Sequence, residues 1–156
     1  MPPSLKPPAL DPATIESKSA SIYPKPFQAA VKGRSRRRLG DALGLTDFGV
    51  NLTRLEPGAA SALRHWHTHE DEFIYVLEGE VTLVTEAGAQ NLGPGMVAGF
   101  PKGQADGHHL VNRGMVPVVY LEIGARHPAD EARYPDVDLD LVRKRLFVHK
   151  DGTPWD

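Results

Sequence analysis

Histidines gather in one short stretch of this sequence, and their spacing could hold a metal ion. Three of the seven histidines stand in HWHTH, at His65, His67 and His69, and a second group, His108 and His109, follows further along the chain. Side chains alternate faces along a β-strand, so His65 and His67 would point the same way, about 6 to 7 Å apart. Two neutral imidazole nitrogens so placed can bind one metal ion at ~2.0 to 2.2 Å each.

Glu72 and the second histidine pair could complete such a site. If the residues between His67 and Glu72 form the loop between two neighbouring strands, the Glu72 carboxylate returns beside the first two histidines. A further ligand must then come from a distant strand, and His108 and His109 have the right chemistry. The sequence therefore predicts a site of imidazole nitrogens and one carboxylate oxygen, and the residues alone leave the choice between His108 and His109 open.

The elements that would position these residues are short apolar segments that follow one another from Arg36 onward, among them FGVNLTRL, EFIYVLEG and VPVVYLEIG. Their length and their content of Val, Ile, Tyr and Phe are typical of β-strands. Turns containing glycine separate them at regular intervals, for example GPG at residues 93–95 and NRG at 112–114. Many short strands with regular turns predict an all-β barrel or sandwich.

Two segments of different composition flank this β region. Residues 1–30 are rich in proline, which prevents a regular helix, and we expect an extended N-terminal arm that is either disordered or lies on a partner subunit. Residues 127–156 are polar, charged and interrupted by proline, and we expect a short C-terminal tail, with at most one helical turn, that packs on or near the barrel. The sequence thus predicts one domain, a barrel over residues 31–126.

The overall composition argues against several classes of function. The 18 Lys and Arg residues stand against 20 Asp and Glu residues, so no global field would recruit nucleic acid or an anionic membrane. The local basic run of Arg34 and Arg36 to Arg38 could bind phosphate, but we favour a solvated basic face. The absence of cysteine excludes disulfides and thiolate ligands. No run approaches the ~18 apolar residues of a membrane span and no signal peptide is evident, so we expect a soluble, cytoplasmic protein.

The first histidine group lies in a segment that resembles the first motif of the cupin family. In GAASALRHWHTHEDEFIYVLEG, residues 58–79, a glycine is followed by H-x-H, a short spacer, a Glu, six residues and a second glycine. The match assigns His65, His67 and Glu72 as ligands and Gly79 as the closing glycine. The interval after the leading glycine is one residue longer than in the usual pattern.

The second histidine pair lies in a segment that resembles the second cupin motif. In GMVAGFPKGQADGHHLVN, residues 95–112, a glycine precedes a Pro-x-Gly element, a histidine and Asn112. The spacing that ends at Asn112 selects His108 over His109 as the ligand of this motif. QADG stands where the usual pattern has two residues, which changes the rim of the predicted site but removes no ligand type.

This resemblance, which covers about residues 50–124, is to small single-domain bacterial cupins. It implies a double-stranded β-helix, a jelly-roll barrel, that holds one divalent transition metal. It also implies a homodimer, because cupins are commonly dimers and an open barrel edge invites pairing. The ligand set that it implies is His65, His67, Glu72 and His108.

Three imidazoles and one carboxylate suit Mn, Fe, Co, Ni or Zn, and they leave one or two positions of the metal open to a small molecule. The resemblance implies a metal-dependent isomerase, lyase or dioxygenase that acts on a small oxygen-rich molecule, such as a sugar derivative or an organic acid. Two alternatives stay open. One is a binding module that senses or stores a small ligand without catalysis, and the other is a metal-free barrel that has only inherited the motifs.

Neighbouring residues receive other interpretations. His69 lies too close to Glu72 for the cupin spacing and is expected in an exposed loop, and His109 should face away from His108. No residue fixes the catalytic chemistry, for which Tyr120 and Glu122 are only candidates. Glu70 and Asp71 are interpreted as solvated loop carboxylates, His127 and His149 as tail residues without ligand spacing, and Trp66, Phe73, Tyr75 and Leu77 as packing between sheets or in a dimer interface.

Overall fold

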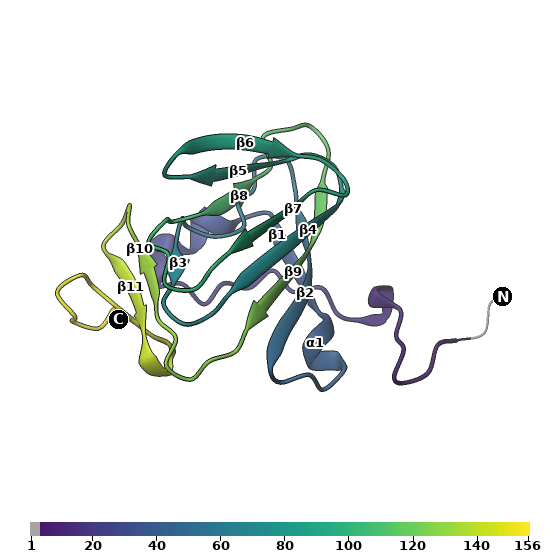
Figure 1. The fold of residues 1–156 in the computed structure, drawn as a ribbon, viewed down its shortest axis with the longest axis horizontal. Coiled ribbons are helices and arrows are strands. Elements are labelled where there is room, and N and C mark those ends of the chain that lie inside the picture. Colours follow the sequence, from purple (N-terminus) through teal and green to yellow (C-terminus); the bar gives the residue numbers. More distant parts are fainter. Residues whose placement is uncertain (1–3) are drawn as a thin grey trace.

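The computed structural model describes residues 4–156, except for the side chain of Lys144, and shows three antiparallel sheets (Figure 1). The five-stranded sheet has the strand order β1-β2-β9-β4-β7. Its strands are β1 (Arg34–Arg38), β2 (Phe48–Leu55), β9 (Val118–Ala125), β4 (Glu72–Glu78) and β7 (Val97–Phe100). The three-stranded sheet has the order β6-β5-β8 and consists of β6 (Gly88–Leu92), β5 (Val81–Thr85) and β8 (His109–Val111). The four-stranded sheet has the order β12-β11-β10-β3 and consists of β12 (Leu146–Val148), β11 (Leu139–Val142), β10 (Ala132–Tyr134) and β3 (Trp66–His67). The predicted all-β jelly-roll barrel is confirmed.

Alternation along the strands of the five-stranded sheet decides which side chains enter the barrel. On β4, Ile74 and Val76 are buried whereas Phe73, Tyr75 and Leu77 are exposed. Neighbouring strands continue the inner face, because Val76 lies opposite Tyr120 of β9 and Ile74 opposite Glu122. The core of buried residues between the sheets consists of Leu55, Ala59, Ile74, Val76, Val81, Leu83, Leu110, Val118 and Tyr120.

Two residues of the predicted motifs hold the barrel together without taking part in chemistry. Gly79 has a φ of 77°, and a Cβ atom at this position would lie 2.6 Å from the carbonyl oxygen of Pro117. Only glycine therefore fits the turn that follows β4. Asn112 is fully buried, and its side-chain amide donates to the carbonyl oxygens of Leu55 at 3.0 Å and Val116 at 2.8 Å.

The C-terminal segment contributes three strands that the sequence analysis did not foresee. Strands β10, β11 and β12 pair in order, and β10 pairs in turn with β3, so that Ala132 lies opposite His67. A 3-10 turn, η3 (Arg143–Arg145), joins β11 and β12. A second core lies beneath this sheet and consists of Tyr23, Val31, Ala132, Tyr134 and Leu139. The C-terminal strands are thus part of the scaffold around the first histidine pair.

The N-terminal arm lies on its own barrel over much of its length. It contains two 3-10 segments, η1 (Pro12–Thr14) and η2 (Lys25–Val31), and the short helix α1 (Leu39–Ala42) follows β1. Lys18 and Arg36 exchange backbone hydrogen bonds of 2.8 and 2.9 Å, which extends the edge of the five-stranded sheet. The chain before η1 reaches away from the barrel (Figure 1). No helix within residues 4–156 is long and apolar enough to cross a membrane.

The expectation that the basic run is a solvated face is wrong for most of its members. Arg34 is only 8% exposed, and the Arg36 Nε atom lies 2.7 Å from a carboxylate oxygen of Glu122 inside the barrel. The Arg37 guanidinium donates to backbone carbonyls of the arm, including that of Ala13 at 3.3 Å. Only Arg38 is well exposed. Alternation along β1 explains the result, because Arg34 and Arg36 share the face that the barrel covers.

Candidate metal centre and its cavity

The two histidine groups meet across an isolated β-bridge. His65 and His108 exchange backbone hydrogen bonds, with His65 N to His108 O at 3.1 Å and His108 N to His65 O at 2.9 Å. Their rings lie 5.0 Å apart, and the rings of His65 and His67 lie 5.1 Å apart. A residue distant in the sequence is thus placed directly beside the HWH segment.

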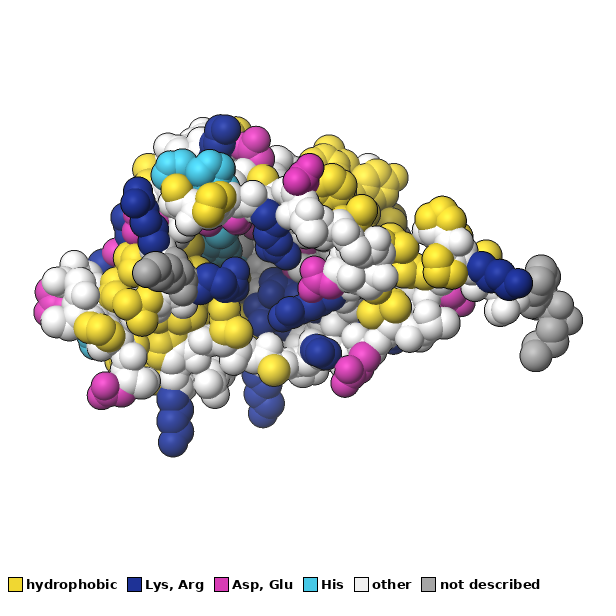
Figure 2. Space-filling model, turned by 90° about the horizontal axis from the view of Figure 1, so that it is seen from below, with side chains coloured by type: hydrophobic (Ala, Val, Ile, Leu, Met, Phe, Trp, Pro, Cys, Tyr) yellow, Lys and Arg dark blue, Asp and Glu magenta, His cyan; other side chains and the backbone are white. Residues whose placement is uncertain are grey.

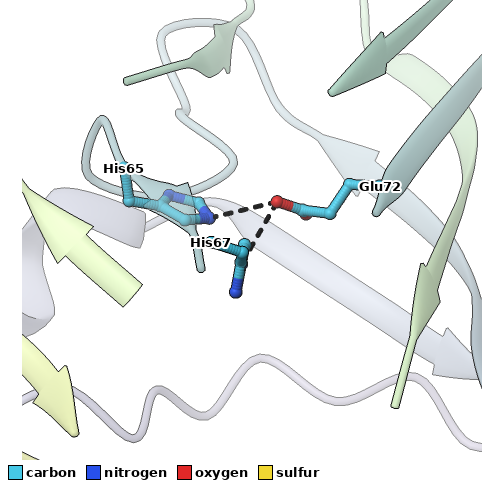
Figure 3. A group of neighbouring side chains, drawn as sticks. All are labelled: His65, His67 and Glu72. Carbon is cyan, nitrogen blue, oxygen red and sulfur yellow. Dashed lines mark ion pairs between the residues drawn. The ribbon is translucent and has the colours of Figure 1, made fainter. Parts of the chain in front are cut away.

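Glu72, the first residue of β4, points its carboxylate toward the imidazoles of His65 and His67 (Figure 3). Its Oε1 atom lies 3.1 Å from His67 Nε2, 3.2 Å from His108 Nε2 and 3.7 Å from His65 Nε2. The ligand atoms of His65, His67 and Glu72 all lie within 4.8 Å of one another. The structure therefore brings together the four side chains that the sequence analysis selected.

The donor atoms fit a shared cation. Ligand atoms that are each ~2.0 to 2.2 Å from one metal ion and about 90 to 120° apart lie about 3 to 3.7 Å from one another. The three distances from Glu72 Oε1 to the imidazole Nε2 atoms lie in this range. Glu72 Oε1 is buried and has no hydrogen-bond partner within the described chain. Facing lone pairs of a carboxylate and imidazoles repel unless a positive charge lies between them. The site is chemically complete only with a bound proton or metal.

Two of the imidazoles are oriented through their other nitrogen. His65 Nδ1 donates to the carbonyl oxygen of Leu63 at 2.8 Å, and His67 Nδ1 lies 2.7 Å from Asp130 Oδ2. With the Nδ1 proton so engaged, Nε2 presents its lone pair to the cluster. The third imidazole, that of His108, stacks on Phe100, with ring centroids 3.5 Å apart.

Burial and the neighbouring charges shift the pKa values of these groups in opposite directions. Burial lowers the pKa of His65 to about 4, so its imidazole is neutral at pH 7. Burial also acts to lower the pKa of His67, but the carboxylates of Asp130 and Glu72 outweigh it and raise that pKa to about 10. Burial acts to raise the pKa of Glu72, but the surrounding imidazoles hold it well below its usual value. Without a metal, the His67 imidazole, which lies between the carboxylates of Asp130 and Glu72, is therefore protonated at pH 7.

A cavity of about 590 Å³ opens from this cluster toward the surface. Figure 2 looks into a hollow in which histidine side chains lie deep and basic side chains lie along the wall and rim. The charged residues that line it are Arg34, Arg36, Arg126 and Arg145, together with Glu70, Glu72, Glu122 and Asp130. A small polar ligand that entered this cavity would meet the histidines and the arginines together.

A second cavity of about 390 Å³ meets the cluster from the other side. It is bounded by Trp66, by the inner ends of β5 to β7 and by residues of the QADG insertion, Gln104 and Asp106. His67, Glu72 and His108 line both cavities. Trp66, interpreted as a packing residue, lines the same cavity as these three residues.

The polar residues that flank the predicted ligands in the sequence make contacts outside the cluster. His69 is exposed, as expected, and stacks on His127 with ring centroids 5.0 Å apart. His109 Nδ1 donates to the carbonyl oxygen of Ala62 at 2.9 Å, away from the cluster. Asp71 is exposed, as expected, and its Oδ1 atom accepts from the backbone N–H of Lys102 at 2.8 Å. Glu70 is half-buried, and its Oε1 atom accepts from the backbone N–H of His127 at 2.9 Å.

Comparisons with known proteins agree with this architecture. A family model described as the cupin domain matches residues 51–124. The crystal structure of a sugar phosphate isomerase of the cupin superfamily from Silicibacter pomeroyi is 46% identical, with a TM-score of 0.90, over 96% of this chain and 97% of that chain. A candidate sugar phosphate isomerase from Acidithiobacillus ferrooxidans is 36% identical, with a TM-score of 0.71, over 76% of this chain and 77% of that chain.

A more distant structure shares the fold alone. A polyketide cyclase from Streptomyces resistomycificus is 20% identical, with a TM-score of 0.68, over 83% of this chain and 85% of that chain. No curated protein sequence matches this chain.

Proposed function

This chain belongs to the cupin family, and from that membership we propose that it is a metal-dependent isomerase of a small sugar phosphate. One observation carries the proposal: the cluster of His65, His67, His108 and Glu72 lies in the same cavity as four arginines. The cavity, at about 590 Å³, is of the size that holds small ligands. Two structural relatives described as sugar phosphate isomerases, at 46% and 36% identity, support it.

The four clustered side chains would hold one divalent transition metal, Mn, Fe, Co, Ni or Zn. When bound, such a metal polarises the carbonyl and neighbouring hydroxyl oxygens of a sugar. The protein's own contribution is to keep His65 and His67 in the tautomer that leaves Nε2 free, through the carbonyl of Leu63 and the carboxylate of Asp130. It also holds Glu72 ionised, because the imidazoles lower the pKa of this carboxyl.

Interconversion of an aldose and a ketose needs a group that carries a proton between adjacent carbons. The proton that leaves C2 returns to C1, and the hydroxyl proton moves from O2 to O1, so no further reactant is consumed. We assign the transfer of the proton between C2 and C1 to Glu122, a residue of β9 that lines the cavity. Its Oε1 atom accepts from Asn51 Nδ2 at 3.1 Å and lies 2.7 Å from Arg36 Nε. These contacts through Oε1 hold the carboxylate in place on the wall of the cavity.

The test is turnover by the full chain loaded separately with Mn, Fe, Co, Ni or Zn. Aldose and ketose phosphates of three to six carbons are incubated in deuterated water and followed by proton NMR. We expect interconversion of one pair, with deuterium entering at C1 or C2, in at least one metal form. Saturable binding without turnover or exchange in every form would instead identify a ligand-binding module and overturn the proposal.

A further inference from the structure

One buried cation in the cavity has no negative partner. Arg34 is 8% exposed, and its guanidinium donates to the carbonyl oxygen of Ser61 at 2.6 Å. No carboxylate within residues 4–156 lies at ion-pair distance from it. Burial, together with the neighbouring charge of Arg36, lowers the pKa of Arg34. An uncompensated buried charge is costly, and an anionic ligand beside Arg34 would relieve that cost.

The carboxylates of the cavity are already engaged elsewhere. Glu122 pairs with Arg36, and Glu72 faces the imidazoles. Asp130 is bound to His67, and Glu70 accepts from a backbone N–H. None of these carboxylates forms an ion pair with Arg34, and a metal at the cluster would add further positive charge. The cavity favours an anionic ligand.

Two more arginines reach the cavity at its entrance. Arg126 and Arg145 are both exposed, and neither forms an ion pair within the described residues. The guanidinium of Arg126 occupies the space beside Gly49, where a Cβ atom would lie 2.8 Å from Arg126 Cζ. A glycine on the inner face of β2 thus makes room for this guanidinium. Arg145 comes from the 3-10 turn between β11 and β12.

We propose that Arg34 anchors an anion subsite, with Arg126 and Arg145 at its entrance, that binds the phosphate group of the substrate. That the other end of the same substrate binds the metal is part of the proposed function, on which this inference rests. Guanidinium groups suit this role because their planar donors match phosphate oxygens and stay charged when buried. The substrate class is therefore a phosphomonoester of a polyhydroxy carbonyl compound, and the same compound without phosphate binds much more weakly.

Inorganic phosphate is the direct probe of this subsite, because it needs no turnover. Its binding to the metal-loaded full chain is measured by calorimetry, and thermal denaturation follows the stabilisation that a ligand of the folded state confers. We expect saturable binding that Arg34→Gln weakens tenfold or more without changing metal content. Arg54→Gln, which removes an exposed arginine at the end of β2, serves as the matched control and should bind phosphate like the wild type.

Gly49→Ala supplies a test that does not depend on the folding of Arg34→Gln. The new methyl group displaces the Arg126 guanidinium without removing its charge, and it should weaken phosphate binding about threefold or more while metal content stays unchanged. Phosphate binding that neither substitution alters would overturn the proposal, since the anion would then be held elsewhere, for example on the metal.

The outcomes separate the subsite from the isomerase activity. Loss of phosphate binding in Arg34→Gln, with no isomerisation by any metal form, would retain the subsite and remove the proposed reaction. Isomerisation with equal kcat/KM for phosphorylated and unphosphorylated sugars, unchanged in Arg34→Gln, would retain the reaction and remove the subsite.

Discussion

Asp130 Oδ2 lies 2.7 Å from His67 Nδ1, on the side of the imidazole that faces away from Glu72. The other oxygen of Asp130 accepts from the backbone N–H of His69 at 2.9 Å, so the carboxylate is fixed from both ends. It belongs to the segment that leads into β10, which pairs with β3. A residue outside the matched cupin region thus sets the orientation of a predicted metal ligand.

The first prediction concerns this contact. Asp130→Asn should lower the affinity for the metal roughly 10- to 100-fold, because the amide is a weaker acceptor and no longer raises the basicity of His67. Metal affinity is measured by competition with a chromophoric chelator. Asp138→Asn is the matched control, since Asp138 makes the same 2.7 Å contact with His149 away from the cluster. Equal metal affinity in the two variants would contradict the role of Asp130.

The second prediction concerns the ligands themselves. His65→Ala and His108→Ala should each leave the purified protein with little or no bound metal, because each removes one of few donors. Metal content is measured by mass spectrometry on protein purified without chelator or nickel resin. His109→Ala should retain the metal, because the His109 ring is bonded to the carbonyl oxygen of Ala62 although its neighbour in the chain is His108. Unchanged metal content in the first two variants would show that the ligand assignment is wrong.

Much of the site could be predicted from the sequence because three of its four residues lie close together in the chain. Alternation along a strand places His65 and His67 on one face, and a short loop returns Glu72 beside them. His108 could be selected over His109 only through the spacing to Asn112 in the second motif. In the structure, the residue that this spacing selects is the one that forms the backbone bridge with His65.

Other parts depend on pairings that no local pattern reveals. The role of Asp130 depends on β10 lying against β3, and β10 to β12 are strands of only three or four residues, of which β10 and β11 mix polar and apolar residues. Such strands lack the apolar run that marks the inner ones. Likewise, a basic run is solvated or buried according to what covers its face, and the barrel covers Arg34.

The third prediction separates catalysis from metal binding. Glu122→Gln should lower kcat by 100-fold or more while metal content stays within about twofold of the wild type, since the amide keeps the contact with Asn51 but cannot take a proton. Glu56→Gln, which alters a carboxylate paired with Arg54 on the surface, is the control. A Glu122→Gln variant with wild-type kcat would exclude the proton-transfer role.

The fourth prediction concerns stability at low pH. The side chain of Arg64 donates to both carboxylate oxygens of Asp136, at 2.9 and 3.0 Å, and lowers the pKa of that carboxyl. A depressed pKa stabilises the fold fully above the unfolded-state pKa of ~3.9, and the stabilisation is lost as pH falls through the folded-state value. The difference in melting temperature between wild type and Asp136→Asn should therefore shrink from pH 6 to pH 3. Because the Asp136 carboxylate is exposed, the difference should also be small and decrease with added salt. A gap that widened on acidification would contradict the assignment.

The last prediction concerns assembly through the outer face of the five-stranded sheet. The exposed apolar side chains on this face and at its edge are Phe73, Tyr75, Leu77, Met96 and Val97. A contiguous apolar surface of this kind is typical of an interface, and we expect a homodimer that buries it. Light scattering after size exclusion should give twice the chain mass, and Tyr75→Glu should give the monomer mass because it places a charge in the interface. Met115→Glu, at an exposed apolar residue outside the strands, should remain dimeric. A wild-type monomer at every concentration would exclude the dimer, and dimeric Tyr75→Glu would place the interface elsewhere.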